Sequence, residues 1–419
     1  MQDEADATAK NILAGAEGTR QLTENVLILP AQGNALAVKA GEGIVLVDSG
    51  AGRGATQKMI GILRDWSDLP VTAICYSHGH AGYNDGVSDW IEHAKARGEE
   101  PPALVGHANV KPRYDRYRET AGLQDNLNRM QFPQFKLAPA GSKLVDPTVT
   151  FDDHLVLNEA GSRVELFWAP SETDDVLALW LPEEKILYAG ASFPGTTLPN
   201  VGTPLRTLRL TIRWAETLER LAALGAETLI QEFGPVIEGA EAVDQRLSGT
   251  AKALRWLRAA VVERMNRGMN DLEIIHDIEC PPDLFDQKWM RERYGAVEYI
   301  VRDIYREENG WWDRNPTNLH PSHPDAAGAA ILDAIGDPQT VLDKARALVD
   351  QGETQLALHV IDLLALAPGD EDAVVEARTM KAELCRERAG QVRPYVSKAL
   401  YATSADLLEN GKRRWSEAQ

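Results

Sequence analysis

Hydrophobic residues in the first half of the chain fall into short runs separated by turn-forming residues. Between Leu22 and Pro235 these runs read as strands, and many are continuous rather than alternating, as in a sheet covered on both faces. The runs are VLILPAQ, ALAVKAGEGIVLVDSG, VTAICYSHGH, PALVGHANV, RVELFWAP, VLALWLPEEKILYAG and AETLIQEFGP. Between them, GATQKMIGILRDWSD, GVSDWIEHAKARG and LRLTIRWAETLERLAALG carry hydrophobic residues at helical spacing. This pattern predicts an α/β region in which two sheets lie between layers of helices.

Beyond about Gly239 the strand pattern ends and amphipathic helices follow. Gly, Pro and Asp residues divide DQRLSGTAKALRWLRAAVVERMNRGM, AILDAIGDPQTVLDKARALVDQG, ETQLALHVIDLLALAPG and DEDAVVEARTMKAELCRERAG. Their lengths favour stacked helical hairpins, although the units are too few for a repeat array. The segment ENGWWDRNPTNLHPSHPD is interpreted as a connector between domains or as a subunit contact.

Composition narrows the class of protein. With 44% hydrophobic and 26% charged residues over 419 positions, the chain is globular and long enough for more than one core. A net charge of −19 disfavours binding to nucleic acid or to anionic membranes. No stretch has the ~18 apolar residues of a membrane span, and the acidic N-terminus has no signal-peptide pattern. The three cysteines, Cys75, Cys280 and Cys385, are too scattered for a disulfide framework, so we expect a cytoplasmic protein.

The segment YSHGHAGYNDG follows a predicted buried strand and carries His78 and His80 on either side of Gly79. Two histidines so spaced can present both imidazoles to one cation when the residue between them turns the backbone, and glycine makes that turn easy. Such pairs also occur without metal, so the spacing alone leaves both interpretations open.

In order and spacing, a set of segments resembles the metallo-β-lactamase fold, and more closely the alkylsulfatase-like branch of that superfamily. They are VDSG, YSHGHAGYNDG, VGHANVKPRYDRYRETAGLQDNLNRMQF, APSETDDVLALWLPEEKILYAGASF and LIQEFGPVIEG. The later segment RYGAVEYIVRDIYREENGWWDRNPTNLHP resembles the helical dimerisation domain of alkylsulfatases. The resemblance covers about residues 20–385. It implies an αββα sandwich followed by an all-α helical-hairpin domain that forms a homodimer.

The resemblance also implies how the chain is divided. We expect an N-terminal extension over 1–21, a metallo-β-lactamase-like domain over 22–245, a helical dimerisation domain over 246–390 and a C-terminal helical tail over 391–419. The lipid-carrier-like third domain of full-length alkylsulfatases is not expected, because too few residues remain after Gly390.

A metal site follows from the same resemblance. The family's motif HxHxDH, with a later glutamate, an acidic residue and a histidine, binds two zinc ions that share a hydroxide. His78, His80 and Glu172 match the ligands of the first ion. The remaining ligand positions carry residues that ligate poorly or not at all, namely Gly82, Tyr83, Ala191 and Phe233. We therefore expect one divalent cation per chain, zinc first, with iron or manganese also suited to two histidines and a carboxylate. A vestigial, empty pocket is the alternative.

Tyr83 and Asp85 are the predicted catalytic residues. The Tyr83 phenol could donate a proton beside a metal-bound water, and Asp85 could orient that water or accept its proton. Alternatively, Tyr83 fills the volume of the lost ion. Glu232, next to Phe233, is a further candidate ligand or base, or else a solvated surface carboxylate.

The predicted substrate-binding residues are His107, Arg113, Arg116 and Asn200. Arg113 and Arg116 could clamp a sulfate or carboxylate with their guanidinium groups, although RYDRYRE fits a salt-bridged helix face equally well. The resemblance implies that His107 and Asn200 lie near the pocket, with a structural role as the alternative for His107. Asp48 resembles a buried aspartate that supports the family's loops.

These observations predict an enzyme with one metal ion that acts on a small organic molecule. The expected reaction is hydrolysis of an ester, lactone or sulfate ester, or a lyase or dehydration step. A non-catalytic, dimeric binding or scaffold protein is the alternative. A third hypothesis is a complete two-metal sulfatase that uses Asp85 and Glu232 as replacement ligands. Neither nucleic acid nor a membrane is expected as a partner.

Overall fold

The computed structural model describes residues 18–134, 139, 141, 143–157 and 163–417. The chain divides into two compact units, each considered by itself. The larger unit holds the described residues of 2–126 and 137–310, and the smaller unit those of 127–136 and 311–419. Residues 1–17 of the predicted N-terminal extension lie outside the described residues.

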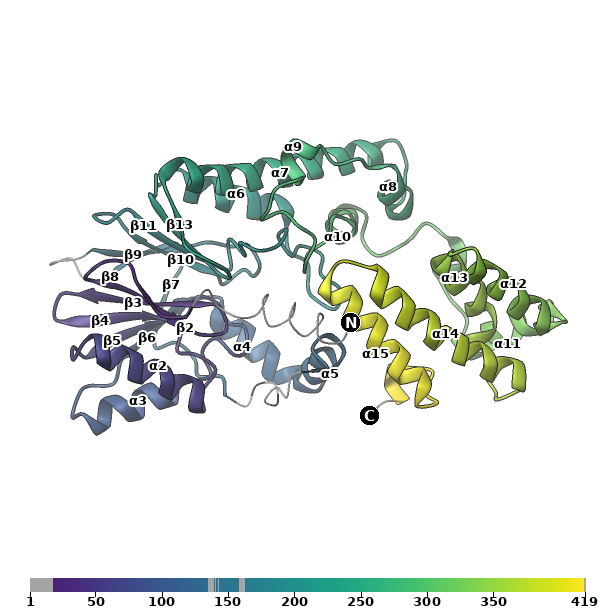
Figure 1. Ribbon diagram of the computed structural model, residues 1–419, viewed down its shortest axis with the longest axis horizontal. Helices are drawn as coiled ribbons and strands as arrows, with labels where there is room; N and C mark the ends of the chain where they lie inside the picture. The colour runs from purple at the N-terminus through teal and green to yellow at the C-terminus, as the bar shows by residue number, and fades with distance from the viewer. Residues whose placement is uncertain (1–17, 135–138, 140, 142, 158–162, 418–419) are drawn as a thin grey trace. The chain divides into compact units, whose positions relative to one another are not determined.

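Two mixed sheets form the centre of the larger unit (Figure 1). The first has seven strands in the order β1-β2-β3-β4-β5-β6-β7, antiparallel as far as β4 and parallel from β4 onward. Its strands are β1 (Arg20–Gln21), β2 (Val26–Pro30), β3 (Asn34–Ala40), β4 (Gly43–Val47), β5 (Val71–Cys75), β6 (Ala103–His107) and β7 (Val149–Phe151). The second has six strands in the order β13-β12-β11-β10-β9-β8, in which β11 and β12 are parallel and the other pairs antiparallel. Its strands are β8 (His154–Leu157), β9 (Val164–Trp168), β10 (Leu177–Leu181), β11 (Ile186–Gly190), β12 (Thr228–Gln231) and β13 (Ile237–Glu238).

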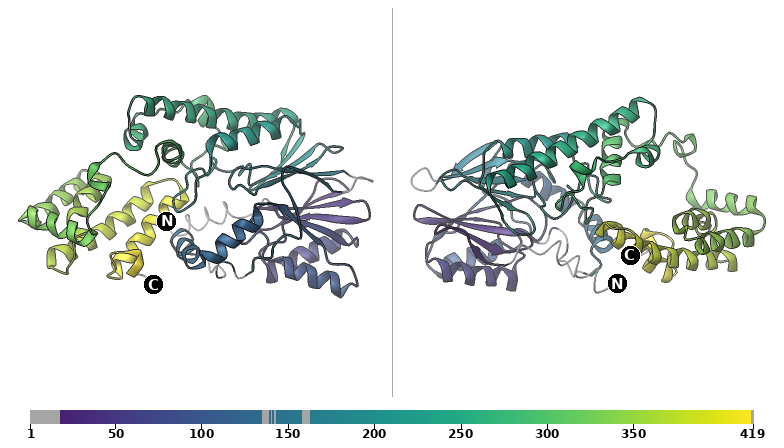
Figure 2. Two further views of the ribbon diagram at one scale, coloured as in Figure 1. Left: turned by 180° about the vertical axis from the view of Figure 1, so that it is seen from behind. Right: turned by 45° about the horizontal axis from the view of Figure 1, so that its top comes forward.

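Helices cover the outer face of each sheet (Figure 2), and a layer of hydrophobic side chains joins the two inner faces. In β3, Leu36 and Val38 face the second sheet, whereas Ala35 and Ala37 face the helices. Both faces of this strand are therefore buried, which explains its continuous hydrophobic run. The predicted αββα sandwich is confirmed. The helices on the first sheet are α2 (Arg53–Trp66), α3 (Val87–Ala96) and α4 (Val110–Glu119), and those on the second are α6 (Thr211–Ala222) and α7 (Ala240–Asn266).

Further helices extend the larger unit beyond the second sheet. Ile300 and Ile304 pack into the same hydrophobic core as Leu254 and Leu257 of α7. The predicted domain boundary between residues 245 and 246 therefore falls inside a continuous helix whose buried side chains lie on both sides of it. The additional helices are α8 (Asp271–Asp277), α9 (Pro282–Phe285) and α10 (Val297–Asn309).

The smaller unit consists of helices that pack as successive hairpins. Its core is built by side chains such as Leu342, Ile361 and Leu384, which lie on three consecutive helices. The predicted all-α helical-hairpin region is confirmed. The helices are α11 (Pro324–Ile335), α12 (Pro338–Asp350), α13 (Thr354–Ala365), α14 (Asp372–Gln391) and α15 (Tyr395–Glu409), with short 3-10 turns η1 (Pro316–Asn318) and η2 (Trp415–Glu417). The helix α5 (Ala121–Gln131) lies near the end of the described segment 18–134, and the division between residues 126 and 127 falls within it.

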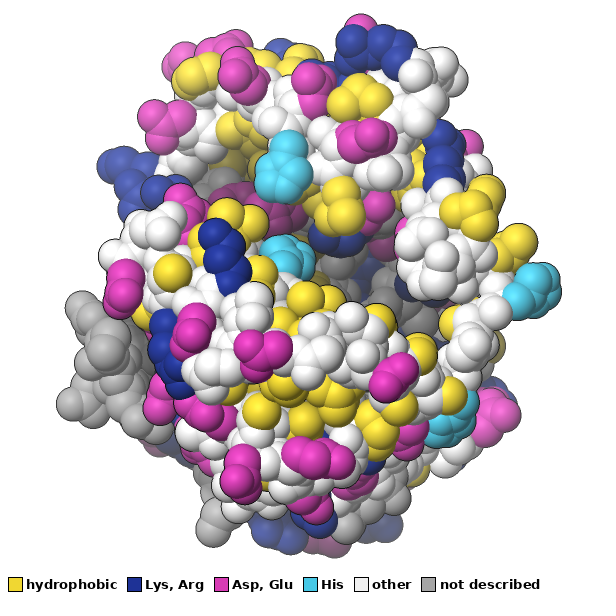
Figure 3. Space-filling model, turned by 90° about the vertical axis from the view of Figure 1, so that its right-hand side faces the viewer, with side chains coloured by type: hydrophobic (Ala, Val, Ile, Leu, Met, Phe, Trp, Pro, Cys, Tyr) yellow, Lys and Arg dark blue, Asp and Glu magenta, His cyan; other side chains and the backbone are white. Residues whose placement is uncertain are grey.

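The outer surface is mixed in character. Figure 3 shows hydrophobic side chains exposed among acidic and basic ones on one face of the molecule. In the part of the chain that the structure describes, no helix is both long enough and apolar enough to cross a membrane.

Candidate metal centre

Three potential ligands converge where two strands end. His78 and His80 lie in the turn after β5, and Glu172 lies in the turn between β9 and β10. His78 Nε2 is 2.9 Å from His80 Nδ1, and Glu172 Oε2 lies 3.8 Å and 3.7 Å from these two nitrogens. Among the described residues, these three form the one group of His, Cys, Asp or Glu side chains whose ligand atoms all lie within 4.8 Å of one another.

The donor set suits a divalent cation. Burial holds the pKa of His78 below its usual value, and burial together with His78 and Arg209 holds the pKa of His80 well below it. Neutral imidazoles keep the lone pair that binds a metal ion. Two nitrogens bound to one zinc ion at ~2.0–2.1 Å lie about 2.9 Å apart at a right angle and about 3.4 Å apart at a tetrahedral angle. The observed separation of 2.9 Å is that of a hydrogen bond between the two rings, so the two nitrogens lie close enough to share one ion that replaces this hydrogen bond.

The glutamate is oriented by two partners that engage its other oxygen. Glu172 Oε1 accepts a hydrogen bond from Asn200 Nδ2 at 2.7 Å and pairs with Arg209 Nη1 at 3.0 Å. Arg209 is only 5% exposed and also donates to the Asn200 carbonyl at 2.9 Å. Burial alone would raise the pKa of Glu172, but Arg209, His78 and Asn200 outweigh it and bring that pKa below its usual value. Glu172 is thus held ionised, with Oε2 facing the histidines.

Hydrogen bonds fix the histidine turn, the turn after β5 that carries His78 and His80. Ser77 Oγ lies 3.0 Å from His78 Nδ1, which leaves Nε2 as the ring nitrogen that faces the other ligands. Asp48 Oδ1 accepts hydrogen bonds from the Ser77 N–H and from Asn84 Nδ2, each at 2.9 Å. A buried network of hydrogen bonds therefore holds the candidate ligands in place, and such bonds orient the ligands of metal sites.

Comparison with known proteins gives the chain its family. Residues 28–231 match the metallo-β-lactamase superfamily, and residues 270–411 match the alkyl sulfatase dimerisation family. A linear primary-alkylsulfatase from a Pseudomonas strain is 29% identical over 342 residues, which cover 77% of this chain and 64% of that protein. An (R)-specific secondary-alkylsulfatase from Pseudomonas is 26% identical over 370 residues, which cover 82% of this chain and 54% of that protein. The chain therefore carries a metallo-β-lactamase domain followed by an alkyl sulfatase dimerisation domain, an arrangement that fits the alkylsulfatase-like branch of the superfamily.

A solved structure supports the fold of this alkylsulfatase-like chain. A double mutant of the sec-alkyl sulfatase PisA1 superimposes with a TM-score of 0.83 at 22% identity, over 97% of this chain and 67% of that one. The resemblance predicted from the sequence motifs is thus confirmed. The chain spans only 54% to 64% of the length of the two curated relatives, so what those longer proteins do is not transferred to it directly.

Four positions depart from the metallo-β-lactamase motif, and among them Tyr83 packs against His78. The Tyr83 ring lies 4.4 Å from the His78 ring, centroid to centroid, and its hydroxyl donates a hydrogen bond to Glu232 Oε1. Gly82 has φ 91°, and a side chain there would collide with the Gln32 carboxamide. Ala191 and Phe233 are 1% and 8% exposed.

Glu232 is a buried residue in this family member. It is 3% exposed, which excludes the alternative of a solvated surface carboxylate. Burial and the nearby Glu172 carboxylate raise the pKa of Glu232 well above its usual value. Asp85 is half-buried and accepts a hydrogen bond from the Gly82 N–H at 3.0 Å. Neither carboxylate belongs to the group of three ligands.

The predicted substrate-binding residues lie in different settings. Asn200 contacts the site directly through Glu172. Arg113 pairs with Asp174 and, at 2.8 Å, with Asp175. Arg116 lies over the Tyr117 ring, 5.0 Å from its centroid.

His107 has both ring nitrogens occupied. The Asn109 N–H donates to His107 Nδ1 at 3.1 Å, so Nε2 carries the proton and donates to the Asp152 carbonyl at 2.7 Å. The ring also stacks on Trp168 with centroids 5.2 Å apart. These contacts agree with the structural alternative for His107, while substrate binding by Arg113, Arg116, His107 and Asn200 stays a prediction.

Sequence reasoning missed Arg209 and Arg206. Arg209 binds Glu172 directly, and Arg206 adds positive charge that lowers the pKa of both His80 and Glu172. Both follow Asn200 in a loop with no motif that would mark them, so only the folded chain reveals their position.

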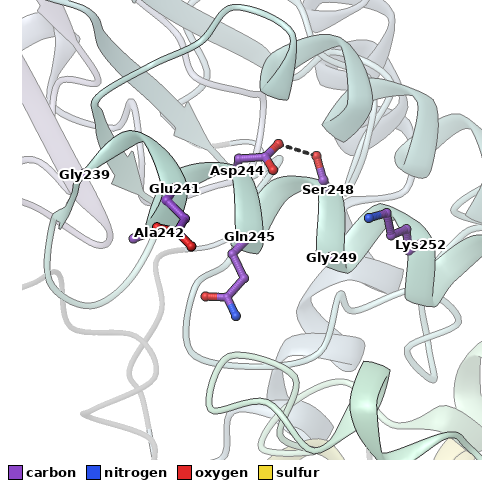
Figure 4. A pocket seen from close by; sticks show the side chains of 8 residues that line it. All are labelled: Gly239, Glu241, Ala242, Asp244, Gln245, Ser248, Gly249 and Lys252. Carbon is purple, nitrogen blue, oxygen red and sulfur yellow. Dashed lines mark hydrogen bonds between the residues drawn. The ribbon is translucent and has the colours of Figure 1, made fainter.

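A separate hollow lies along α7 (Figure 4). It is open to solvent, has a volume of about 590 Å³, and is lined by Gly239 and by residues from the first half of this helix. None of the three ligands borders it, and its charged groups include Asp244, which accepts a hydrogen bond from the Ser248 hydroxyl at 2.6 Å. The lining residues are Gly239, Glu241, Ala242, Asp244, Gln245, Ser248, Gly249 and Lys252.

Proposed function

We propose that this chain is a metal-dependent hydrolase that acts on a small organic ester. It would hold one divalent cation on His78, His80 and Glu172, and zinc is the leading candidate. The observation that carries the proposal is the convergence of these three side chains within 4.8 Å. At such a site a divalent cation supplies Lewis-acid chemistry. Iron or manganese remains compatible with the same donor set, because two histidines and one carboxylate also suit those ions.

The residues that stand where the family binds a second metal ion support one bound cation rather than two. Tyr83, Ala191 and Phe233 offer no strong ligand there, and the Tyr83 hydroxyl is engaged by Glu232. Gly82 has no side chain, and the Gln32 carboxamide lies where one would project. A second cation would therefore have to displace buried partners as well as find ligands.

The proposed substrates are anionic esters, among which sulfate esters are the leading candidates. The names of the curated relatives point to alkyl sulfate esters as the first compounds to test. Arg206 is half-buried, lies close enough to influence His80 and Glu172, and makes no side-chain hydrogen bond or ion pair with the described residues. A guanidinium without a partner beside a metal centre suits a sulfate or carboxylate group.

Proton transfer is assigned to the residues next to the ligands. The Tyr83 phenol lies beside the His78 ring, and its hydroxyl donates a hydrogen bond to the buried Glu232 carboxylate. Asp85 lies in the same turn, where its carboxylate accepts from Gly82. General acid and base groups placed in this way are what hydrolysis or elimination needs.

The first test is metal content. Elemental analysis of the purified chain should find about one divalent cation per chain, and His80→Ala and Glu172→Gln should lose most of it, because each removes a ligand. His276→Ala, an exposed histidine on α8, is the matched control and should retain the metal. Circular dichroism of each variant separates loss of metal from loss of fold.

Activity is then measured on alkyl sulfate esters, carboxylic esters and lactones with zinc-, manganese- and iron-loaded protein. Turnover that disappears in His80→Ala but persists in His276→Ala supports the hydrolase. Two cations per chain would favour the two-metal sulfatase instead. A folded chain without metal would leave the binding or scaffold role.

We also propose that the chain forms a homodimer through its helical region, as the match to the dimerisation family suggests. The smaller unit exposes hydrophobic side chains that a partner could cover. Ile331 of α11 is 43% exposed and Leu356 of α13 is 49% exposed. Leu366, in the turn after α13, is 54% exposed. Light scattering should give twice the chain mass of 46.1 kDa, and a strict monomer would contradict this.

A further inference from the structure

The carboxylate of Asp175 joins the two ligand-bearing turns. Asp175 Oδ2 accepts a hydrogen bond from the Gly79 N–H at 2.7 Å, and Gly79 is the residue between the two histidines. Asp175 itself lies three positions after Glu172 in the turn SETDD. A single side chain therefore ties the backbone of the histidine turn to the turn that carries the third ligand.

The other carboxylate oxygen is equally engaged. Asp175 Oδ1 accepts from Arg113 Nε at 2.8 Å and from the Thr173 hydroxyl. The Asp175 side chain is fully buried, and the Arg113 side chain is 10% exposed. Buried ion pairs with complete hydrogen bonding have one well-defined geometry. Asp175 is thus locked in position from α4 while it holds Gly79.

The fit around Gly79 is close. A Cβ at this position would lie 2.7 Å from Asp175 Oδ2 and 2.8 Å from Arg113 Cδ. Glycine is therefore needed here to let the carboxylate approach the backbone, in addition to any role in turning the chain.

We propose that Asp175, locked by Arg113, is the positioning residue that keeps the histidine pair and Glu172 in register for a single cation. This inference rests on the metal centre proposed above. It also assigns Arg113 a task that differs from clamping a substrate anion, since its guanidinium is already held by two carboxylates. Groups that orient metal ligands commonly change metal affinity by ~10–100-fold when removed.

Asp174 provides a matched control for Asp175. Its carboxylate also pairs with Arg113, but its side chain is 46% exposed and has no hydrogen bond to Gly79 among the described residues. Asp174→Asn and Asp175→Asn therefore remove the same charge from the same arginine. Only Asp175→Asn disturbs the link to the histidine turn, because an amide cannot accept from both Gly79 and Arg113 through two oxygens.

The experiment measures zinc affinity of the full chain by competition with a chelator, and the absorption spectrum of the cobalt(II)-loaded chain. Asp175→Asn and Gly79→Ala should each weaken zinc binding by about 10-fold or more and alter the cobalt spectrum. Asp174→Asn should leave both close to wild type. Thermal unfolding of each metal-free variant shows that the fold is retained, and if Asp175→Asn does not fold, Gly79→Ala decides alone.

Folded Asp175→Asn or Gly79→Ala protein with wild-type zinc affinity and cobalt spectrum would overturn the positioning role while leaving the metal centre intact. Equal losses in Asp174→Asn and Asp175→Asn would overturn it too, because charge alone would then explain the effect. Absence of zinc binding in the wild-type chain would reject the metal centre itself, and the positioning role with it, before any substitution is made.

Discussion

Asp48 combines an unusual backbone conformation with a buried carboxylate. It directly follows β4 and has φ 62°, a left-handed conformation that Asn and Asp tolerate better than most residues. Its side chain receives hydrogen bonds from Ser77 and Asn84 and so supports the turn that carries the histidines. Burial raises the pKa of Asp48 to about 6, although the hydrogen bonds from Ser77 and Asn84 act in the opposite direction.

This pKa predicts a specific pH dependence of stability. A carboxyl group whose pKa is higher in the folded chain stabilises the fold below its unfolded pKa of ~3.9 and loses that contribution as pH rises through about 6. The total change is about 3 kcal/mol, taking ~1.4 kcal/mol per pKa unit. Urea unfolding between pH 4 and 7 should show this loss in the wild-type chain and a flatter profile in Asp48→Asn. The amide is the chosen replacement because it keeps a carbonyl oxygen and tolerates the same backbone conformation.

The control for this prediction is Asp65→Asn, which removes an exposed carboxylate from α2. The wild-type profile should persist in that variant. Parallel profiles for wild type and Asp48→Asn would show that the buried carboxyl group does not titrate in this range. All measurements are made on metal-free protein, so that ligand protonation does not contribute through metal release.

Residue by residue, the sequence predicts the ligands better than their supports. His78 and His80 are separated by one residue, and Glu172 stands in a motif, so a pattern can identify them as candidate ligands. Arg209 reaches Glu172 only because the loop after Asn200 folds over the site. Such a contact depends on tertiary structure, and the spacing of residues in the sequence does not indicate it.

The helices and strands show which patterns are reliable. Strands buried on both faces, such as β3, β4 and β10, leave long hydrophobic runs and were predictable. By contrast, β7 has three residues with an exposed start, and β8 is half-exposed, so neither leaves such a run. These short strands owe their pairing to the neighbours β6 and β9 rather than to their own sequence.

The turn between β9 and β10 is organised by its own hydrogen bonds. The Ser171 N–H donates to the Thr173 carbonyl at 3.1 Å, and the Ser171 hydroxyl donates to the Ala169 carbonyl at 2.9 Å. The Trp168 indole donates to the Asp174 carbonyl at 2.8 Å. Two hydrogen bonds relate this turn to the histidine turn: the Gly79 N–H donates to Asp175, and the Leu177 N–H donates to the Ser77 carbonyl at 2.8 Å.

At the scale of the molecule, the sequence indicates both parts of the fold but not where the compact units divide. Their division between residues 310 and 311 lies inside the segment identified as a connector. The change from strands to helices near Gly239 marks a change in secondary structure only. Leu247 and Leu254 of α7 still belong to the core of the second sheet, so the helix stays with the larger unit.

The smaller unit is assembled from two separate stretches of chain. Gln134 Nε2 donates to the Tyr395 hydroxyl at 2.5 Å, and the Thr403 hydroxyl donates to the Met130 carbonyl at 3.3 Å. The Phe132 and Tyr395 rings stack with centroids 6.0 Å apart. The stretch that ends at residue 134 therefore packs on α15, far away in the sequence.

This arrangement predicts an unusual result of limited proteolysis. Exposed loops are the preferred sites of nicking, and Arg314 is an exposed basic residue between α10 and α11. Brief trypsin treatment should cut after Arg314 and give two fragments on a denaturing gel. Under native conditions the fragments should still elute together, because Met130, Phe132 and Gln134 on one fragment pack against α15 on the other. Arg314→Gln should resist this cut, and separate elution of the nicked fragments without denaturant would contradict the packing of the two stretches.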